Sequence, residues 1–471
     1  MLIKLTDETL LSLATNLNND EIMTHYYELA VNNKITSDKP DSLVKFYFAL
    51  FGYFENKLFC KKSIDPLDFF GMKKHDENSD YVKYLYLLDR MNYEILININ
   101  NDIFIPPHIL EEFYGKYAHA LYIFGYYYKC LEFCQKALDI NSHSSLSTFL
   151  KSSVIEICYI NKHDYITNAA LFNYQKQLIN ICDPSKVRVS KEIFNEVHDI
   201  IISRTESMAP LFQAINFVRA KNTFKETQKV QHNWTREKDF YLRNKLFLNP
   251  LNMFDNFTAA SNEEFPDFDI SNNNKKYCKS LIDDYNMCRH KLYSFYRQPS
   301  RYSKNEISML YSYIYSIFDK LAFLLKKIYN LDIDDGKVEF KSFLFDKKLK
   351  NTNIKFKEIT NDNIWPLFLI MQEVKENRKL TILRSSTYGH NKLRNKIEHR
   401  SVSLTEKDEL KDKSLHLLKL SRDAILHAFA LIETCPKKYA VDKATMMGTT
   451  FQWAGKRIFD KAQKLTTQEH T

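Results

Sequence analysis

The most regular hydrophobic pattern in the chain lies between residues 303 and 329. Apolar residues recur there at alternating spacings of three and four, which places them on one face of a helix. The positions are Ile307, Leu310, Ile314, Ile317, Leu321, Leu324 and Ile328. Ser303 and Glu306 stand where a capping box would close the start of this helix, because each side chain can accept from the other residue's backbone N–H. The pattern therefore predicts one long helix with a buried seam.

Two further apolar segments predict helices towards the C-terminus. The first begins near Ile364 and continues to about Met371. The second covers about residues 406–434 and is ended by Pro436, because proline disfavours helix at the residue before it. Its apolar positions are Leu415, Leu418, Ile425, Phe429 and Ile432. These spacings are those of buried helix faces.

The first half of the chain also has apolar residues at helical spacing, with little strand-like alternation, up to about residue 225. The composition changes near residue 230, where Trp234 begins a charged stretch. Two asparagines then flank Pro250 within the block 244–252, which favours a loop or a helix boundary. Residues 254–276 are rich in Asn, Asp, Ser and Phe and are predicted to form a surface loop. We therefore expect a helical region over 1–228, a second domain over 229–435 and a basic tail over 436–471.

Composition agrees with an all-α fold. The 471 residues include only 8 Gly and 11 Pro, which is few turn-forming residues for this length. The 8 Cys form no C-x-x-C pair, so neither a zinc site nor a disulfide framework is indicated, and a reducing compartment fits. No apolar run approaches the ~20 residues that a membrane helix needs. We expect a cytoplasmic protein without membrane contact, metal or other cofactor.

The charge distribution permits an anionic partner for the second domain. The net charge is +9, and the sequence pI is about 8.8. Lysine is dense over residues 341–357, and both Lys and Arg are frequent over residues 375–400. A positive surface of this kind can attract nucleic acid, and it also serves solubility. The chain has 29 Tyr and 34 Phe, which we expect mainly to pack between helices.

The second basic stretch contains a candidate catalytic sequence that begins at Arg394 and ends at His399. On a straight helix, residues five positions apart lie about 140° apart around the axis. One copy therefore does not direct both side chains at the same phosphate unless the helix ends or bends between them. Two copies related by a two-fold axis can bring four such groups together, so we expect a homodimer.

These residue types suit RNA cleavage without a metal ion, with the 2′-OH of the RNA as the nucleophile. His399 can accept the proton of that hydroxyl or protonate the leaving 5′-oxygen. Arg394 can stabilise the charge that develops on the phosphate. Asn395 can orient the imidazole or bind a phosphate oxygen. The expected product carries a 2′,3′-cyclic phosphate, and DNA is spared because it lacks the 2′-OH.

Spacing alone does not single out this pair, because Arg422 and His427 are also five positions apart. Chance produces such pairs in a chain with 14 His. The sequence context separates them. Between residues 394 and 400 the only apolar residue is Ile397, whereas His427 has apolar neighbours at positions 425, 426 and 429. We expect His427 to be a packed, hydrogen-bonded core histidine.

Residues 111–142 resemble one tetratricopeptide repeat. The matching positions are Gly125, Tyr127, Cys130, Ala137 and Leu138. In such repeats the small residues let two helices cross closely while the aromatic ring fills the gap. The resemblance implies a tetratricopeptide-like array over residues 1–228 whose concave surface binds a protein or peptide. An irregular helical domain is the alternative. Cys130 and Cys134 are expected to be small apolar residues on one helix face.

The sequence from Arg394 to His399 resembles the R-N-x-x-x-H signature of HEPN domains. The block 244–252 resembles the opening of one HEPN subfamily that is often found with tetratricopeptide-like repeats. HEPN domains are compact helical domains, and many are dimeric, metal-independent endoribonucleases. The resemblance covers about residues 230–435 and implies a HEPN-like helical domain after the N-terminal array. It also implies a regulated role in antiviral defence or stress response through RNA cleavage.

The same resemblance assigns roles to individual residues. Arg394 and His399 take the catalytic roles, with Asn395 as their polar companion. HEPN domains also tend to carry an acidic or polar residue on an earlier helix facing the motif, and Asp319 is the candidate here. A solvated carboxylate on the helix surface is the equal alternative for Asp319. The other expected site residues are Glu398 and Arg400 in supporting roles, and Lys392 and Lys396 in RNA binding.

A second class of function stays open. The chain could be a non-catalytic scaffold, in which a helical array holds a partner and the HEPN-like part serves for dimerisation or RNA binding. The presence of Arg, Asn and His together argues against loss of activity. An NTP-hydrolysing enzyme finds little support, because neither a G-x-x-x-x-G-K-[ST] loop nor a G-x-G-x-x-G turn occurs.

Overall fold

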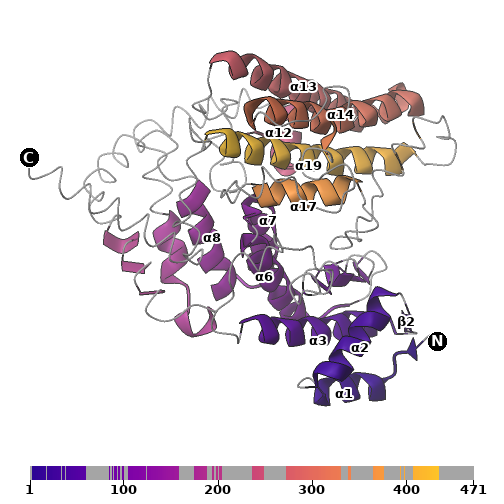
Figure 1. Cartoon of the computed structure of the whole chain (residues 1–471), viewed down its shortest axis with the longest axis vertical. Coiled ribbons are helices and arrows are strands. Elements are labelled where there is room, and N and C mark those ends of the chain that lie inside the picture. Colours follow the sequence, from indigo (N-terminus) through magenta and orange to yellow (C-terminus); the bar gives the residue numbers. More distant parts are fainter. Residues whose placement is uncertain are drawn as a thin grey trace, which may run out of the picture.

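The computed structural model of the chain is mostly helical, and its two halves share a continuous apolar core (Figure 1). The structure describes residues 3–16, 19–32, 34–37, 39–59, 104–123, 125–158, 174–187, 236–248, 272–329, 338–340, 364–375, 393, 397 and 407–433, with single residues between 84 and 99 and between 194 and 203. No helix within these ranges is long and apolar enough to cross a bilayer.

Four helices form the C-terminal part: α13 (Asn272–Arg297), α14 (Lys304–Tyr329), α17 (Ile364–Lys375) and α19 (Lys407–Glu433). The short 3-10 turn η4 (Pro299–Arg301) joins α13 to α14. Helix α19 lies between the α13–α14 pair on one side and α17 on the other (Figure 1). The Tyr329 hydroxyl donates to the Leu431 carbonyl oxygen at 3.1 Å, and the Lys407 ammonium donates to the Tyr302 carbonyl oxygen. Helices α14 and α19 therefore run in the same direction.

The predicted seam helix is confirmed as α14. Six of the seven seam residues are buried, and Ile328 is partly buried against the same core. The predicted capping box also forms: Ser303 N donates to Glu306 Oε2 at 2.7 Å, and Glu306 N donates to Ser303 Oγ at 3.3 Å. The predictions near 364–371 and 406–434 are confirmed as α17 and α19. Periodicity located these helices because each buries one continuous face.

The N-terminal part begins with a small parallel pair of strands, β1 (Ile3–Lys4) and β2 (Ile35–Thr36). The helices that follow along the chain are α1 (Asp7–Thr15), α2 (Asp20–Val31), α3 (Pro40–Phe59), α6 (Pro107–Ile123), α7 (Tyr127–Ile140) and α8 (Ser145–Cys158), then the 3-10 turn η1 (Pro184–Lys186). Helix α7 packs against both α6 and α8. The structure thus has consecutive packed helices where the sequence predicted them.

The hairpin between α6 and α7 lies where the sequence resembles a tetratricopeptide repeat. Gly125 has φ of 70°, a conformation that glycine adopts without a Cβ clash, and it allows the reversal of the chain. Cys130, Cys134 and Ala137 are fully buried on α7, and the two sulfur atoms are 3.9 Å apart. The expectation that both cysteines are apolar packing residues is confirmed. Assignment of the whole region to the tetratricopeptide class stays a prediction.

The junction before the C-terminal helices contains α12 (Arg236–Arg243). This helix ends at Arg243, directly before the block 244–252, and the predicted boundary at Pro250 lies outside the described residues. The Leu246 carbonyl oxygen accepts hydrogen bonds from the Tyr285 hydroxyl at 2.8 Å and from Arg289 Nη1 at 3.4 Å, so the start of the block packs on α13. The predicted loop over 254–276 is wrong at its end, because α13 begins at Asn272.

Candidate functional site

The predicted catalytic sequence falls between α17 and α19 along the chain, and the structure describes one position within it, Ile397, and Leu393 directly before it. Leu393 is buried in the core, and Ile397 packs against that core with part of its side chain exposed. Both positions are helical. The predicted site residues Lys392, Arg394, Asn395, Lys396, Glu398, His399 and Arg400 lie outside the described residues.

Asp319, the acidic residue predicted to assist the motif, is half-buried on α14. Its Oδ1 accepts a hydrogen bond from the Phe340 backbone N–H at 3.0 Å. The Phe340 ring lies 5.3 Å from the Phe318 ring, so the segment 338–340 is fastened to α14 at this point. The half-buried carboxylate thus has a structural partner that neither of the two sequence interpretations predicted. Its pairing with the motif stays a prediction.

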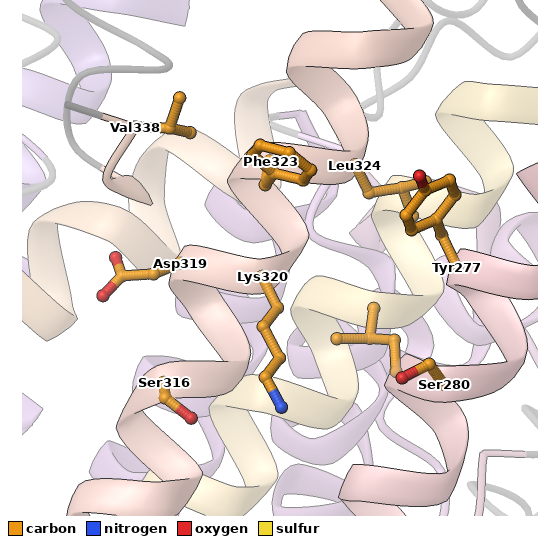
Figure 2. Close-up of a pocket in the computed structure, with 9 residues that line it drawn as sticks. Tyr277, Ser280, Ser316, Asp319, Lys320, Phe323, Leu324 and Val338 are labelled. Carbon is orange, nitrogen blue, oxygen red and sulfur yellow. The ribbon is translucent and has the colours of Figure 1, made fainter. Parts of the chain in front are cut away.

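Asp319 also lines a pocket of about 350 Å³ between α13 and α14 (Figure 2). Tyr277 and Ser280 come from α13, and Phe323 and Lys320 come from α14. Lys320 Nζ pairs with Asp284 Oδ2 at 2.6 Å. The Lys327 ammonium lies 4.6 Å from the Tyr277 ring centroid and 4.5 Å from that of Phe323. This pocket therefore has a mixed aromatic and charged lining. Its two charged residues already have partners in the chain: Lys320 pairs with Asp284, and Asp319 accepts from the Phe340 backbone N–H.

The competing Arg–His pair, Arg422 and His427, is buried on α19. Arg422 is 4% exposed and His427 is 1% exposed. Arg422 Nε donates to Asp423 Oδ1 at 2.8 Å, and its Nη1 donates to the Lys245 carbonyl oxygen. The His427 ring centroid lies 4.7 Å from that of Tyr128. The expected packing of His427 in the core is confirmed, and this pair is not available to an RNA phosphate.

A buried polar network that sequence reasoning missed joins α7 to α17 and α19. Glu373, on α17, is 8% exposed. Its Oε2 accepts from Lys129 Nζ at 3.2 Å, and its Oε1 lies 3.1 Å from His416 Nε2. Burial favours the neutral acid, but Lys129 and His416 outweigh that effect and hold the pKa of Glu373 well below its usual range. The sequence indicates this network only through one carboxylate, Glu373, in the otherwise mostly apolar α17.

Tyr126, directly before α7, adds a further contact between this part of the chain and α19. Its hydroxyl donates to Asp423 Oδ2 at 3.1 Å, in a buried position. Burial and the neighbouring Asp423 carboxylate raise the pKa of Tyr126 well above its usual value, so the hydroxyl remains a donor at neutral pH. The Tyr126 ring also lies 5.6 Å from the His427 ring. The N-terminal end of α7 therefore contacts α19 directly at Asp423 and His427, and Lys129 is linked to His416 of α19 through Glu373.

Across the described ranges, no group of three or more His, Cys, Asp and Glu residues is placed to hold a metal ion. None of Cys130, Cys134, Cys182, Cys278 and Cys288 forms a disulfide, and all five are buried. Burial raises the pKa of Cys288 to about 12, so this thiol is protonated and unreactive at neutral pH. None of these cysteines is positioned as a nucleophile.

Comparison with known proteins gives one match. Residues 277–434 match the family described as LA2681-like HEPN. The match covers α14, α17, α19, almost all of α13 and the whole sequence from Arg394 to His399. It begins after the block 244–252, which packs on α13 from outside the matched region. No curated protein and no solved structure matches the chain.

Proposed function

Starting from an LA2681-like HEPN domain in residues 277–434, we propose that the protein is a metal-independent endoribonuclease that cleaves RNA by attack of the 2′-OH. The observation that carries this proposal is that the matched region encloses the whole Arg394–His399 sequence. Arg394 stabilises the charge on the phosphate, and His399 transfers the proton. The burial of Arg422 and His427 supports this choice, because it removes the competing pair of the same spacing.

The remaining parts of the site follow from the same chemistry. Asn395 orients the imidazole, with Glu398, Arg400 and Asp319 in support, while Lys392 and Lys396 bind the RNA backbone. The active form is a homodimer that brings two motifs together across a two-fold axis. The N-terminal helices receive the signal from a protein or peptide partner. The role that fits is a regulated cytoplasmic effector in antiviral defence or stress response.

The experiment is incubation of purified full-length protein with total RNA in EDTA, beside the His399→Ala and Arg394→Ala variants. We expect the wild-type protein to cut RNA and to leave 2′,3′-cyclic phosphate ends, and both variants to lose about 10²- to 10⁴-fold in rate. Light scattering on the same samples should give the mass of two chains for all three proteins.

His290→Ala is the matched control. This histidine also lies in the C-terminal helices, but it is exposed and its Nδ1 pairs with Glu237 Oε1 at 2.6 Å on the surface. Its loss should leave cleavage unchanged. Cleavage that persists in both His399→Ala and Arg394→Ala would overturn the assignment of the site. Intact RNA with wild type, alone and with partners of the N-terminal region, would favour the scaffold alternative.

A further inference from the structure

We propose that α7 is a positioning element of the C-terminal domain, and that Glu373 is the residue through which it acts. By holding Glu373, the N-terminal helices fix the two helices on either side of the candidate catalytic sequence. The effect on catalysis rests on the proposed ribonuclease function, whereas the effect on the two helices does not. Glu373 is therefore a positioning residue and does not itself contact RNA in this proposal.

The geometry places one carboxylate at the meeting point of three helices. Glu373 lies two residues before the end of α17, and His416 lies in the first half of α19. Lys129 reaches the same carboxylate from α7. The residues between α17 and α19 include Arg394 to His399. The contact thus joins the described helix that precedes the catalytic sequence in the chain to the one that follows it, and ties both to the N-terminal half.

A second contact between the start of α7 and α19 fixes the orientation of α19 as well as its position. Tyr126, one position before α7 begins, donates to Asp423 on α19, while Tyr126 and Tyr128 hold the His427 ring between them. His416 and Asp423 are seven positions apart, which is about 10 Å along a helix. Asp423 meets Tyr126 directly, whereas His416 is linked to Lys129 of α7 through Glu373. Together these two links fix the angle of α19 relative to the pair of α7 and α17 as well as its position. A single contact would leave that angle free.

Charge and burial make the arrangement sensitive to the position of α7. Glu373 is buried and ionised, so its environment must supply opposite charge. The Lys129 ammonium supplies it from α7 while His416 Nε2 faces the other carboxylate oxygen, so withdrawal of Lys129 leaves only His416 beside Glu373. A partner that shifts α7 would therefore displace α17, α19 or both. Close-packed elements respond to such a shift by moving between discrete arrangements, which gives the N-terminal helices a route to the catalytic sequence.

The test compares Lys129→Met with wild type by hydrogen exchange of the full-length protein. Methionine keeps the aliphatic stem of Lys129 and removes the ammonium. We expect amide exchange in α17 and the first half of α19 to become about tenfold faster, with no change in α13. Lys129→Arg should restore slow exchange because it keeps the charge. Glu373→Gln, which stays polar and similar in volume, should reproduce the effect of Lys129→Met.

Lys116→Met is the matched control within the same helical hairpin. Lys116 Nζ pairs with Glu112 Oε1 at 2.6 Å along α6 and lies over the Phe48 and Phe51 rings of α3, so the substitution removes contacts that do not involve α17 or α19. It should leave exchange in α17 and α19 unchanged. Equal exchange in Lys129→Met, Lys116→Met and wild type would overturn the proposal, whether or not the protein cuts RNA. Failure of the proposal is thus distinguishable from failure of the proposed function.

Kinetics separate positioning from RNA binding. We expect Lys129→Met to lower kcat about tenfold to a hundredfold with KM for RNA unchanged, because misplaced catalytic groups lose rate without losing substrate affinity. Lys129→Arg should recover most of kcat. A rise in KM with unchanged kcat would assign α7 to RNA binding and would overturn its positioning role.

Discussion

Two Arg–His pairs of identical spacing stand in very different sequence surroundings within the C-terminal part of the chain. Arg422 and His427 lie on α19 among apolar residues and are almost fully buried, with Asp423, the Lys245 carbonyl and two tyrosine rings as partners. Arg394 and His399 belong to a basic stretch with Ile397 as the one apolar residue up to position 400. Spacing therefore carries no function by itself. Burial with fixed partners marks the first pair as structural, and the second pair carries the proposed chemistry.

Arg422→Ala should have the largest effect on stability. The substitution leaves Asp423 buried without its guanidinium partner, and we expect the free energy of unfolding to fall by about 3–5 kcal/mol. Chemical denaturation of the two proteins measures this difference. Arg243→Ala is the control, because the Arg243 side chain is 76% exposed and should change stability by less than about 0.5 kcal/mol. A fully stable Arg422→Ala protein would contradict the structural role of the buried pair.

His399→Ala should affect RNA cleavage strongly and stability little, which is the opposite of what we expect for Arg422→Ala. We expect RNA cleavage to fall by at least about 10²-fold while the free energy of unfolding changes by less than about 0.5 kcal/mol. The rate and the denaturation midpoint should be measured on the same preparation. A large loss of stability would show that His399 is also a packing residue, and the contrast between the two pairs would disappear.

Tyr126→Phe tests the N-terminal side of the buried pair. The change removes the hydroxyl that donates to Asp423 and keeps the ring against His427. We expect a loss of about 1–2 kcal/mol in unfolding free energy, because a buried carboxylate loses a donor. Tyr277→Phe serves as the control: the Tyr277 ring is largely exposed, and its hydroxyl contacts Lys327 on the surface. Equal stability of Tyr126→Phe and wild type would mean that α7 adds little to the α19 network.

Acid should weaken the contact between α7 and α17. The pKa of Glu373 is lower in the folded protein than in the unfolded chain, so its stabilising contribution is present above about pH 4.3, the usual value for Glu. This contribution falls as the pH drops below that value towards the lower folded pKa. The stability difference between wild type and Glu373→Gln should therefore shrink by about 1 kcal/mol between pH 5 and pH 3. A difference independent of pH would show that Glu373 is not ionised in the fold.

Much of the fold followed from local pattern. The seam from Ile307 to Ile328, the capping box at Ser303 and the helix over 406–434 were all predictable, because each depends on side chains close in sequence. The helical start of α13 at Asn272 was not predictable, because its Asn-rich sequence favours a loop. The candidate motif was likewise found from sequence, by its resemblance to HEPN domains.

The sequence by itself determined the helical class, the positions of the main C-terminal helices and the two Arg–His pairs that could carry chemistry. Only the tertiary structure decided that Arg422 and His427 are buried and that Lys129 meets Glu373 across 244 positions of the chain. Helical periodicity reports which face of a segment is buried, but not what lies against it. Partners of a buried charge come from distant segments, and their identity is fixed only when the helices pack.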